Sequence, residues 1–329
     1  MPGRGALHRN KGRGLYILLL GGAMAVLPWL LNNEYYLTVF IFLGINVILV
    51  IGLNLLMGYA GQISLGHAAF FACGAYISGI LNTKCGLSPW MTFPIGMLLT
   101  GAVAFLLGKP ILKLKGNYLA MATLGFGLIV EHLLVEWGEL TGGPSGLVNI
   151  ERLHIGSNPL YTPGIRYYYL VWFLVICVIL LVSNLIDSRA GRALRALHGS
   201  ELAASTLGVD TAHYKVQVFV LSAVLAALGG GLYAHYLGFI APGSCGLSYS
   251  IELVAMVVVG GIATFWGSIF GAAFLTLLPQ MLTILQDYDI IVYGIILVVT
   301  VLFLPQGIAQ GGTLLIRFVK KKAALRGEG

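Results

Sequence analysis

The stretch that decides the fold is residues 36–71, which read YLTVFIFLGINVILVIGLNLLMGYAGQISLGHAAFF. Its first part, residues 36–57, carries no charged residue. About 20 apolar helical residues cross the roughly 30 Å hydrocarbon core of a bilayer, so this part predicts a membrane-spanning helix. Glycines then interrupt the apolar run near one membrane boundary, and a second apolar segment follows at residues 63–82.

The interruption contains three polar residues, Gln62, Ser64 and His67. Polar groups at membrane depth usually face a cavity or a partner, so one interpretation is that these three line a polar path. The other interpretation is a tight turn followed by a helix that packs closely on its neighbours. Both remain open from the sequence.

Composition extends the membrane interpretation to the whole chain. Of 329 residues, 58% are hydrophobic and 9% are charged, whereas globular domains carry about 25% charged residues. The net charge of +7 does not indicate nucleic-acid binding, because the basic residues lie in short segments between apolar runs rather than on one soluble face. We expect an all-α polytopic membrane protein.

Ten stretches approach the length needed to cross the bilayer. They are residues 15–31, 36–57, 63–82, 89–108, 117–137, 167–186, 214–238, 251–265, 267–286 and 290–308. With both chain ends in the cytoplasm, 16 of the 19 basic residues fall on the inner side, as the positive-inside rule requires. Removing two neighbouring spans would keep this asymmetry, so eight spans is the alternative to ten.

These spans predict one transmembrane domain over residues 15–308, between basic cytoplasmic tails at residues 1–14 and 309–329. The outer loop, about residues 138–166, is longer than the 2 to 8 residues usual between bundled helices, which indicates a docking surface for an external partner. The inner loop, about residues 187–213, alternates Arg192 and Arg195 with apolar residues at helical spacing. Such an amphipathic helix lies either at the lipid interface or in a groove of a soluble partner.

The stretch 117–137 places Thr123, Gly127 and Glu131 on one helical face. A carboxylate facing lipid costs several kcal/mol. We therefore expect Glu131 to point at protein or water, either within the bundle or at the wetted outer interface.

Catalytic motifs are missing. The sequence has no GxxxxGK[ST] phosphate loop, no HExxH and no GxSxG. Its four cysteines show no CxxC spacing, so no metal site is indicated. We predict that the chain is not an enzyme and needs no cofactor.

Several segments together resemble the permease subunits of bacterial ABC importers for branched-chain amino acids, of the M type. The resemblance is carried by residues 52–76, 115–125, 140–146, 191–193, 201–209, 258–261 and 266–271. It implies the fold of type II ABC importers, with an inverted repeat that relates the helices at 36–137 to those at 214–308. Residues in the inner loop also resemble the segment by which such permeases contact their ATPase, namely Arg192, Arg195, Glu201, Ala203, Ala204 and Gly208. The spacing from Glu201 to Gly208 is one residue longer than in the better-known importers.

The resemblance further implies an H-type sister permease, two cytoplasmic ABC ATPases and a periplasmic amino-acid-binding protein as partners, in the bacterial inner membrane. The expected function is import of leucine, isoleucine and valine, with Gln62, Ser64, His67, Thr123 and Glu131 along the path. A urea or amide permease of the same family and an ion-coupled secondary carrier are the alternatives.

Overall fold

The structure is a computed structural model, and it describes residues 19–29, 33–155, 158–159 and 164–282, together with the helical residues 291, 294, 295, 298 and 302. The predicted basic tails and most of the predicted last span lie outside the described residues.

Nearly all the described residues are helical. A helix at Leu19–Trp29 precedes α2 (Glu34–Asn54), the π-helix η1 (Leu55–Tyr59), α3 (His67–Cys85), α4 (Pro89–Ile111), α5 (Asn117–Glu136), α6 (Gly138–Thr141), the 3-10 helix η2 (Gly143–Ser145), strands β1 (His154–Ile155) and β2 (Asn158–Pro159), α7 (Ile165–Asp187), α8 (Arg189–Gly199), α9 (Glu201–Thr206), α10 (Thr211–Leu237), the 3-10 helix η3 (Pro242–Cys245), α11 (Leu247–Gly260) and α12 (Phe265–Leu282). Strands β1 and β2 form a two-residue antiparallel hairpin.

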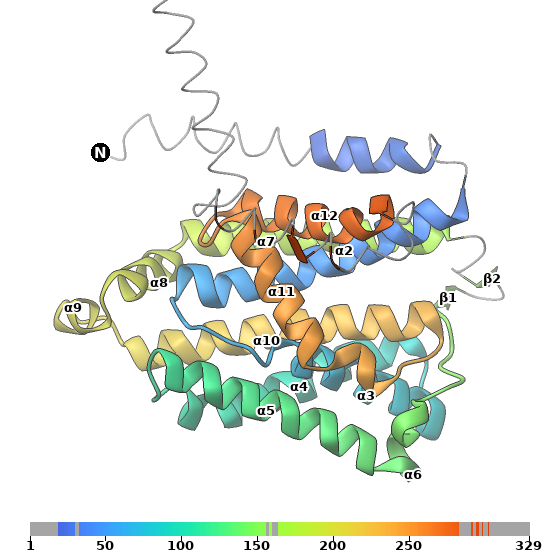
Figure 1. Cartoon of the computed structure of the whole chain (residues 1–329), viewed down its shortest axis with the longest axis horizontal. Helices are drawn as coiled ribbons and strands as arrows, with labels where there is room; N and C mark the ends of the chain where they lie inside the picture. Colours follow the sequence, from blue (N-terminus) through green and yellow to red (C-terminus); the bar gives the residue numbers. More distant parts are fainter. Residues whose placement is uncertain are drawn as a thin grey trace, which may run out of the picture.

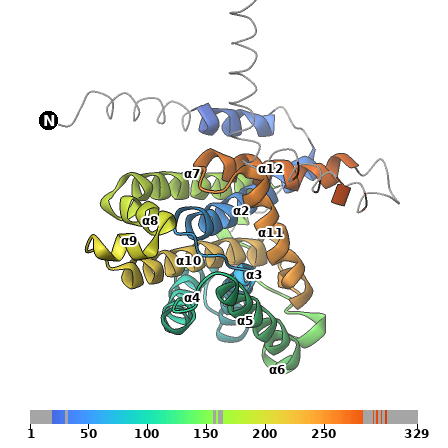
Figure 2. The ribbon, with the colours of Figure 1, turned by 60° about the vertical axis from the view of Figure 1, so that its left-hand side comes forward.

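The long helices lie side by side, and the two predicted loops lie at opposite ends of the bundle (Figure 1). Helices α8 and α9 project from one end, whereas α6 and the β1–β2 hairpin lie at the other. The rotated view in Figure 2 again shows α8 and α9 at the edge of the bundle. Six helical stretches within the described residues are long and apolar enough to cross a membrane, which agrees with a polytopic membrane protein.

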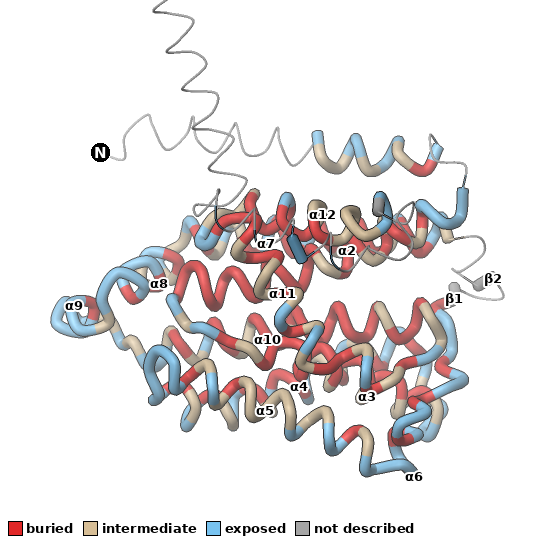
Figure 3. Tube along the Cα trace, viewed as in Figure 1, coloured by how far each residue is buried: buried red, intermediate tan, exposed pale blue. Residues whose placement is uncertain are grey.

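Helix α2 forms the centre of the bundle, where it packs against α7, α10, α11 and α12. It is buried along most of its length, whereas α5 has a largely exposed surface (Figure 3). Helix α3 packs on α4 and α10. Glycines allow the closest of these approaches, because a Cβ at Gly74 would collide with the backbone of Ala227 and one at Gly230 with the carbonyl of Phe71.

Two predicted spans have different boundaries in the structure. The span predicted at 63–82 begins only at His67, because residues 60–66 are not helical and Gly61 adopts a left-handed φ of 67°. The span predicted at 251–265 is α11, which begins at Leu247 and ends at Gly260 before Gly261, whose φ is 112°. Each of these two helices therefore borders a stretch of irregular backbone.

Capping residues define the ends of α9 and α10. The Asp210 carboxylate accepts the His213 N–H at the start of α10. The Ser200 hydroxyl accepts the Ala203 N–H at the start of α9. Helix α10 ends at Gly238, in the left-handed conformation that glycine adopts without strain.

Candidate functional site

The first irregular segment, residues 60–66, runs from the α8 end of the bundle toward its interior. Gly61 lies against His198 of α8. Gly66 lies against the carbonyl of Thr123 in α5, where a Cβ would collide with that oxygen. The Thr123 hydroxyl accepts the Leu65 N–H at 3.0 Å, and it donates to the Ala120 carbonyl at 3.0 Å. Thr123 therefore holds this segment against α5.

Ser64 and His67 lie just before and at the start of α3, and both are buried. His67 hydrogen-bonds the backbone of Leu49 in α2. Its Nε2 and the Ser64 hydroxyl have no hydrogen-bond partner in the described part of the chain. Buried polar atoms are nearly always paired, so two orphans three residues apart need a water or a ligand to satisfy them.

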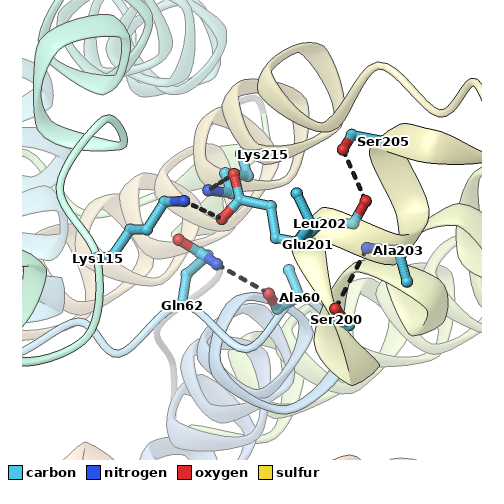
Figure 4. Close-up of polar contacts among 9 residues, drawn as sticks. All are labelled: Ala60, Gln62, Lys115, Ser200, Glu201, Leu202, Ala203, Ser205 and Lys215. Atoms are coloured by element: carbon cyan, nitrogen blue, oxygen red, sulfur yellow. Dashed lines mark hydrogen bonds and ion pairs between the residues drawn. The ribbon is translucent and has the colours of Figure 1, made fainter.

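Gln62 lies apart from these two residues. Its amide donates to the Ala60 carbonyl at 3.0 Å. Figure 4 shows it beside the side chains of Glu201 and Lys115. Gln62 is therefore at the α8–α9 end of the bundle rather than along its middle.

Glu131 points at protein, as expected for a carboxylate in an apolar helix. Its Oε2 accepts the Leu247 N–H at 3.3 Å, at the first residue of α11. The carboxylate also lies against Gly246, where a Cβ would approach Oε1 to 2.7 Å. A negative charge at a helix N-terminus is favourable because the first N–H groups have no partners within the helix. Thr123, Gly127 and Glu131 all face the residues 65–66 and 246–247, which confirms that they share one face.

The second irregular segment, residues 261–264, is joined to α2 by Asn54. The Asn54 amide donates to the Thr264 carbonyl at 2.9 Å and to the Ser268 hydroxyl at 2.7 Å, and its oxygen accepts the Ala263 N–H at 3.0 Å. Gly58 lies directly against Ala263. The two irregular segments thus meet beside the end of α2. The sequence interpretation did not single out Asn54, although an amide within an apolar helix is the signal that identifies such residues.

Glu252 is a second residue that the sequence interpretation missed. This carboxylate lies in α11 within an apolar stretch, and it is half-buried. No described residue forms an ion pair or a hydrogen bond with its side chain.

The predicted ATPase-contact residues divide into two groups. Arg192, Arg195, Ala203 and Gly208 are exposed at the end of the bundle. Ala204 is buried, and Glu201 faces inward: its carboxylate lies 2.7 Å from Lys215 and 3.7 Å from Lys115 (Figure 4). The side chain of Lys215 is 3% exposed, so a counter-charge is essential there. Glu201 therefore joins α9 to the bundle.

Charge governs the protonation of this carboxyl. Burial alone would raise the pKa of Glu201, but the hydrogen bond and charge of Lys215, together with Lys115, outweigh it and hold that pKa below its usual range.

Two leucines near Glu201 point away from the bundle. Leu202 is 77% exposed and Leu207 is 81% exposed, which is an unusual position for large apolar side chains unless a partner covers them.

Both ring nitrogens of His235 in α10 are engaged. Nε2 lies 2.8 Å from the Ser78 hydroxyl, and Nδ1 lies 2.6 Å from the Glu151 carbonyl. Asn82 adds two bonds to Glu151, one from its amide to the Glu151 carboxylate and one from the Glu151 N–H to its oxygen. This network fastens the outer loop to α3 and α10.

Comparison with known proteins gives consistent results. The family described as "Branched-chain amino acid transport system / permease component" matches residues 35–301. The chain is 34% identical over 286 residues, 80% of this chain and 67% of the relative, to the high-affinity branched-chain amino acid transport system permease protein LivM of Escherichia coli K12. It is 23% identical to LivH of Salmonella typhimurium over 79% of this chain and 90% of that protein. It is 31% identical to the autoinducer 2 import system permease protein LsrC of Salmonella paratyphi B over 50% of this chain and 48% of that protein. No solved structure matches the chain significantly.

Proposed function

This chain belongs to the family of permease components of branched-chain amino acid transport systems, and from that premise we infer that it forms one half of the path of an ATP-driven importer for leucine, isoleucine and valine. The observation that carries the proposal is the 34% identity to LivM across 80% of the chain. The protein is a multi-pass permease of the inner membrane. Hydrolysis of ATP belongs to separate subunits.

The topology proposed for it has ten spans with both ends in the cytoplasm, arranged as an inverted repeat of the type II importer kind. Two observations support the assignment of the two sides. The loops at 138–166 and 187–213 lie at opposite ends of the bundle (Figure 1). The basic residues also concentrate in the segments assigned to the inner side.

The path for the amino acid follows α3, α5 and α11. Ser64 and His67 support it, because each has a buried polar atom without a protein partner. Thr123 and Glu131 act at its walls, where they hold the irregular segment before α3 and the start of α11. Gln62 lies at its cytoplasmic end, and Glu252 adds a carboxylate to α11. Irregular backbone at membrane depth is tolerated where it lines a cavity or is buried in protein.

Helices α8 and α9 form the contact with the ATPase. Arg192 and Arg195 present charge there, and Leu202 and Leu207 present exposed apolar surface that a groove of a soluble partner would cover. Glu201 transmits movement of α9 to α10 through Lys215. The remaining partners are an H-type sister permease, a second ATPase, a periplasmic amino-acid-binding protein and the surrounding lipid.

Uptake of labelled amino acids and of labelled urea into a deletion strain, with and without the restored gene, tests the proposal. We expect loss of leucine, isoleucine and valine uptake on deletion, with urea unaffected. Loss of urea uptake alone would identify an amide permease instead. The purified chain in proteoliposomes should transport nothing without the ATPase subunits and ATP. Transport driven by an ion gradient alone would contradict the proposal.

A further inference from the structure

A pocket of about 350 Å³ lies between α2, α3, α10, η3 and α11. We call it the central pocket. Its walls include the apolar side chains of Phe42, Ile45 and Phe71, and its polar groups include Asn46, Ser244 and Tyr249. Small-molecule sites have volumes of about 300–1,000 Å³ and are mostly apolar with a few placed polar groups. The central pocket has this composition, and none of the described residues that line it is charged.

The central pocket lies near the middle of the membrane-spanning bundle. Asn46 is half-way along the 26-residue helical stretch Glu34–Tyr59. Helix α11 begins beside α3 in the same region, where the rings of Tyr249 in α11 and Phe71 in α3 lie 5.1 Å apart. The Ser250 hydroxyl then accepts the Ala68 N–H near the start of α3. Transporters of other folds bind substrate near the midplane beside such interrupted helices.

The polar groups of the pocket are fixed in orientation. The Tyr249 hydroxyl donates to the Asn46 oxygen at 2.7 Å, and the Asn46 amide donates to the Thr276 hydroxyl at 2.9 Å. The second amide hydrogen of Asn46 has no partner in the described part of the chain. The Ser244 hydroxyl is hydrogen-bonded to Tyr233, and its oxygen keeps a further lone pair for a ligand.

His67 lies one helical turn beyond the central pocket on two of its walls. It is four residues from Phe71 along α3, and it bonds the backbone of Leu49, which is four residues from Ile45 along α2. Its Nε2 is buried and has no partner among the described residues. An unsatisfied polar atom next to an apolar pocket is the arrangement that a zwitterion with an apolar side chain would fill.

We propose that the central pocket receives the aliphatic side chain of the transported amino acid, with Asn46, Ser244 and His67 contacting its charged groups. This inference rests on the proposed function, and it assigns a substrate site to the permease itself in addition to that of the binding protein. The pocket then selects by size as the amino acid crosses.

Two variants test the pocket in cells that contain the complete transporter. Ser244→Leu reduces the volume of the central pocket, and Phe42→Ala enlarges it. Phe42 is itself half-buried. Maximal uptake rates are measured at saturating amino acid, so that affinity for the binding protein does not decide the result. Ser244→Leu should lower the leucine-to-valine rate ratio about tenfold, the size of effect that one methylene has in an apolar pocket. Phe42→Ala should raise the rate for phenylalanine relative to valine.

Phe173→Ala is the matched control, because Phe173 lies on α7 and is 63% exposed. It should leave both ratios unchanged. His67→Leu should reduce uptake more than His67→Gln, because glutamine keeps a hydrogen-bonding group at this position, with equal amounts of protein in the membrane. If the wild type imports normally but neither pocket variant changes its uptake-rate ratio, the proposal that the central pocket receives the amino acid is wrong. The proposed function would then remain intact. Absence of amino acid uptake by the wild type would instead overturn the proposed function.

Discussion

The ammonium of Lys215 lies 2.7 Å from Oε1 of Glu201, and this ion pair joins α9 at the end of the bundle to α10 inside it. Lys215 is almost fully buried, so the pair is a fixed mechanical link between the two helices.

Removing one member of the pair should damage both stability and coupling. Glu201→Gln leaves Lys215 buried without its counter-charge, which costs about 1–3 kcal/mol in unfolding free energy. The same variant should also reduce the increase in ATP hydrolysis that the binding protein causes in the complete transporter. Thermal unfolding and ATPase assays of the purified complex measure the two effects. The double variant with Lys215→Gln should lose less than the sum of the single variants, because contacting residues couple. Strict additivity would show that the pair does not act as a link.

The pair also predicts a pH dependence. The pKa of Glu201 is lowered in the folded protein, so its contribution is complete above the pKa of the unfolded chain. That contribution is lost as the pH falls through the lowered folded-state pKa. The stability difference between wild type and Glu201→Gln should therefore be constant near neutral pH and shrink in acid. Thermal unfolding at a series of pH values measures it, and a difference that grows in acid would reverse the assigned sign.

Asn54 should be essential to the second irregular segment. Asn54→Leu removes three hydrogen bonds and leaves the Ala263 N–H and the Ser268 hydroxyl without this partner. We expect a loss of about 1–3 kcal/mol for each buried group left unsatisfied and a strong decrease in uptake. Ser268→Ala, which removes one of the three bonds, should have a smaller effect. Equal effects of the two variants would contradict the role given to Asn54.

Two helical glycines should respond in opposite ways to the same substitution. At Gly74 a Cβ collides with the backbone of Ala227, so Gly74→Ala should destabilise the protein by about 1–3 kcal/mol through overpacking. At Gly125 no atom lies within 4 Å of an added Cβ. Gly125→Ala should be neutral or stabilising by up to about 1 kcal/mol in an uncomplexed chain, because alanine is the better helix former. Thermal unfolding in detergent compares them directly.

The exposed face of α8 and α9 should carry ATPase binding. Arg192→Glu and Leu202→Asp each change a side chain exposed at this end, and both should reduce co-purification with the ATPase subunits in mild detergent. Arg166→Glu, at the start of α7 and the opposite end of the bundle, is the control. If neither Arg192→Glu nor Leu202→Asp changes the amount of ATPase that co-purifies, this face is not the contact with the ATPase.

Much of this organisation is already present in the sequence. Apolar length predicts helices, because backbone groups in a bilayer must be satisfied within the helix. The spacing of Thr123, Gly127 and Glu131 predicts their shared face. The long loops at 138–166 and 187–213 follow from the placement of the spans. Each of these inferences depends on neighbouring residues along one helix.

Tertiary structure alone decided which polar residues meet. Glu201 and Lys215 pair across the junction of α9 and α10, a contact that helical periodicity does not give. Asn54 reaches Ala263, and Asn46 reaches Tyr249, more than 200 positions away along the chain. Helical periodicity gives the face on which a residue lies, but not the neighbour that this face contacts. That neighbour depends on how glycines such as Gly74 and Gly230 let the helices approach, which only the packed bundle specifies.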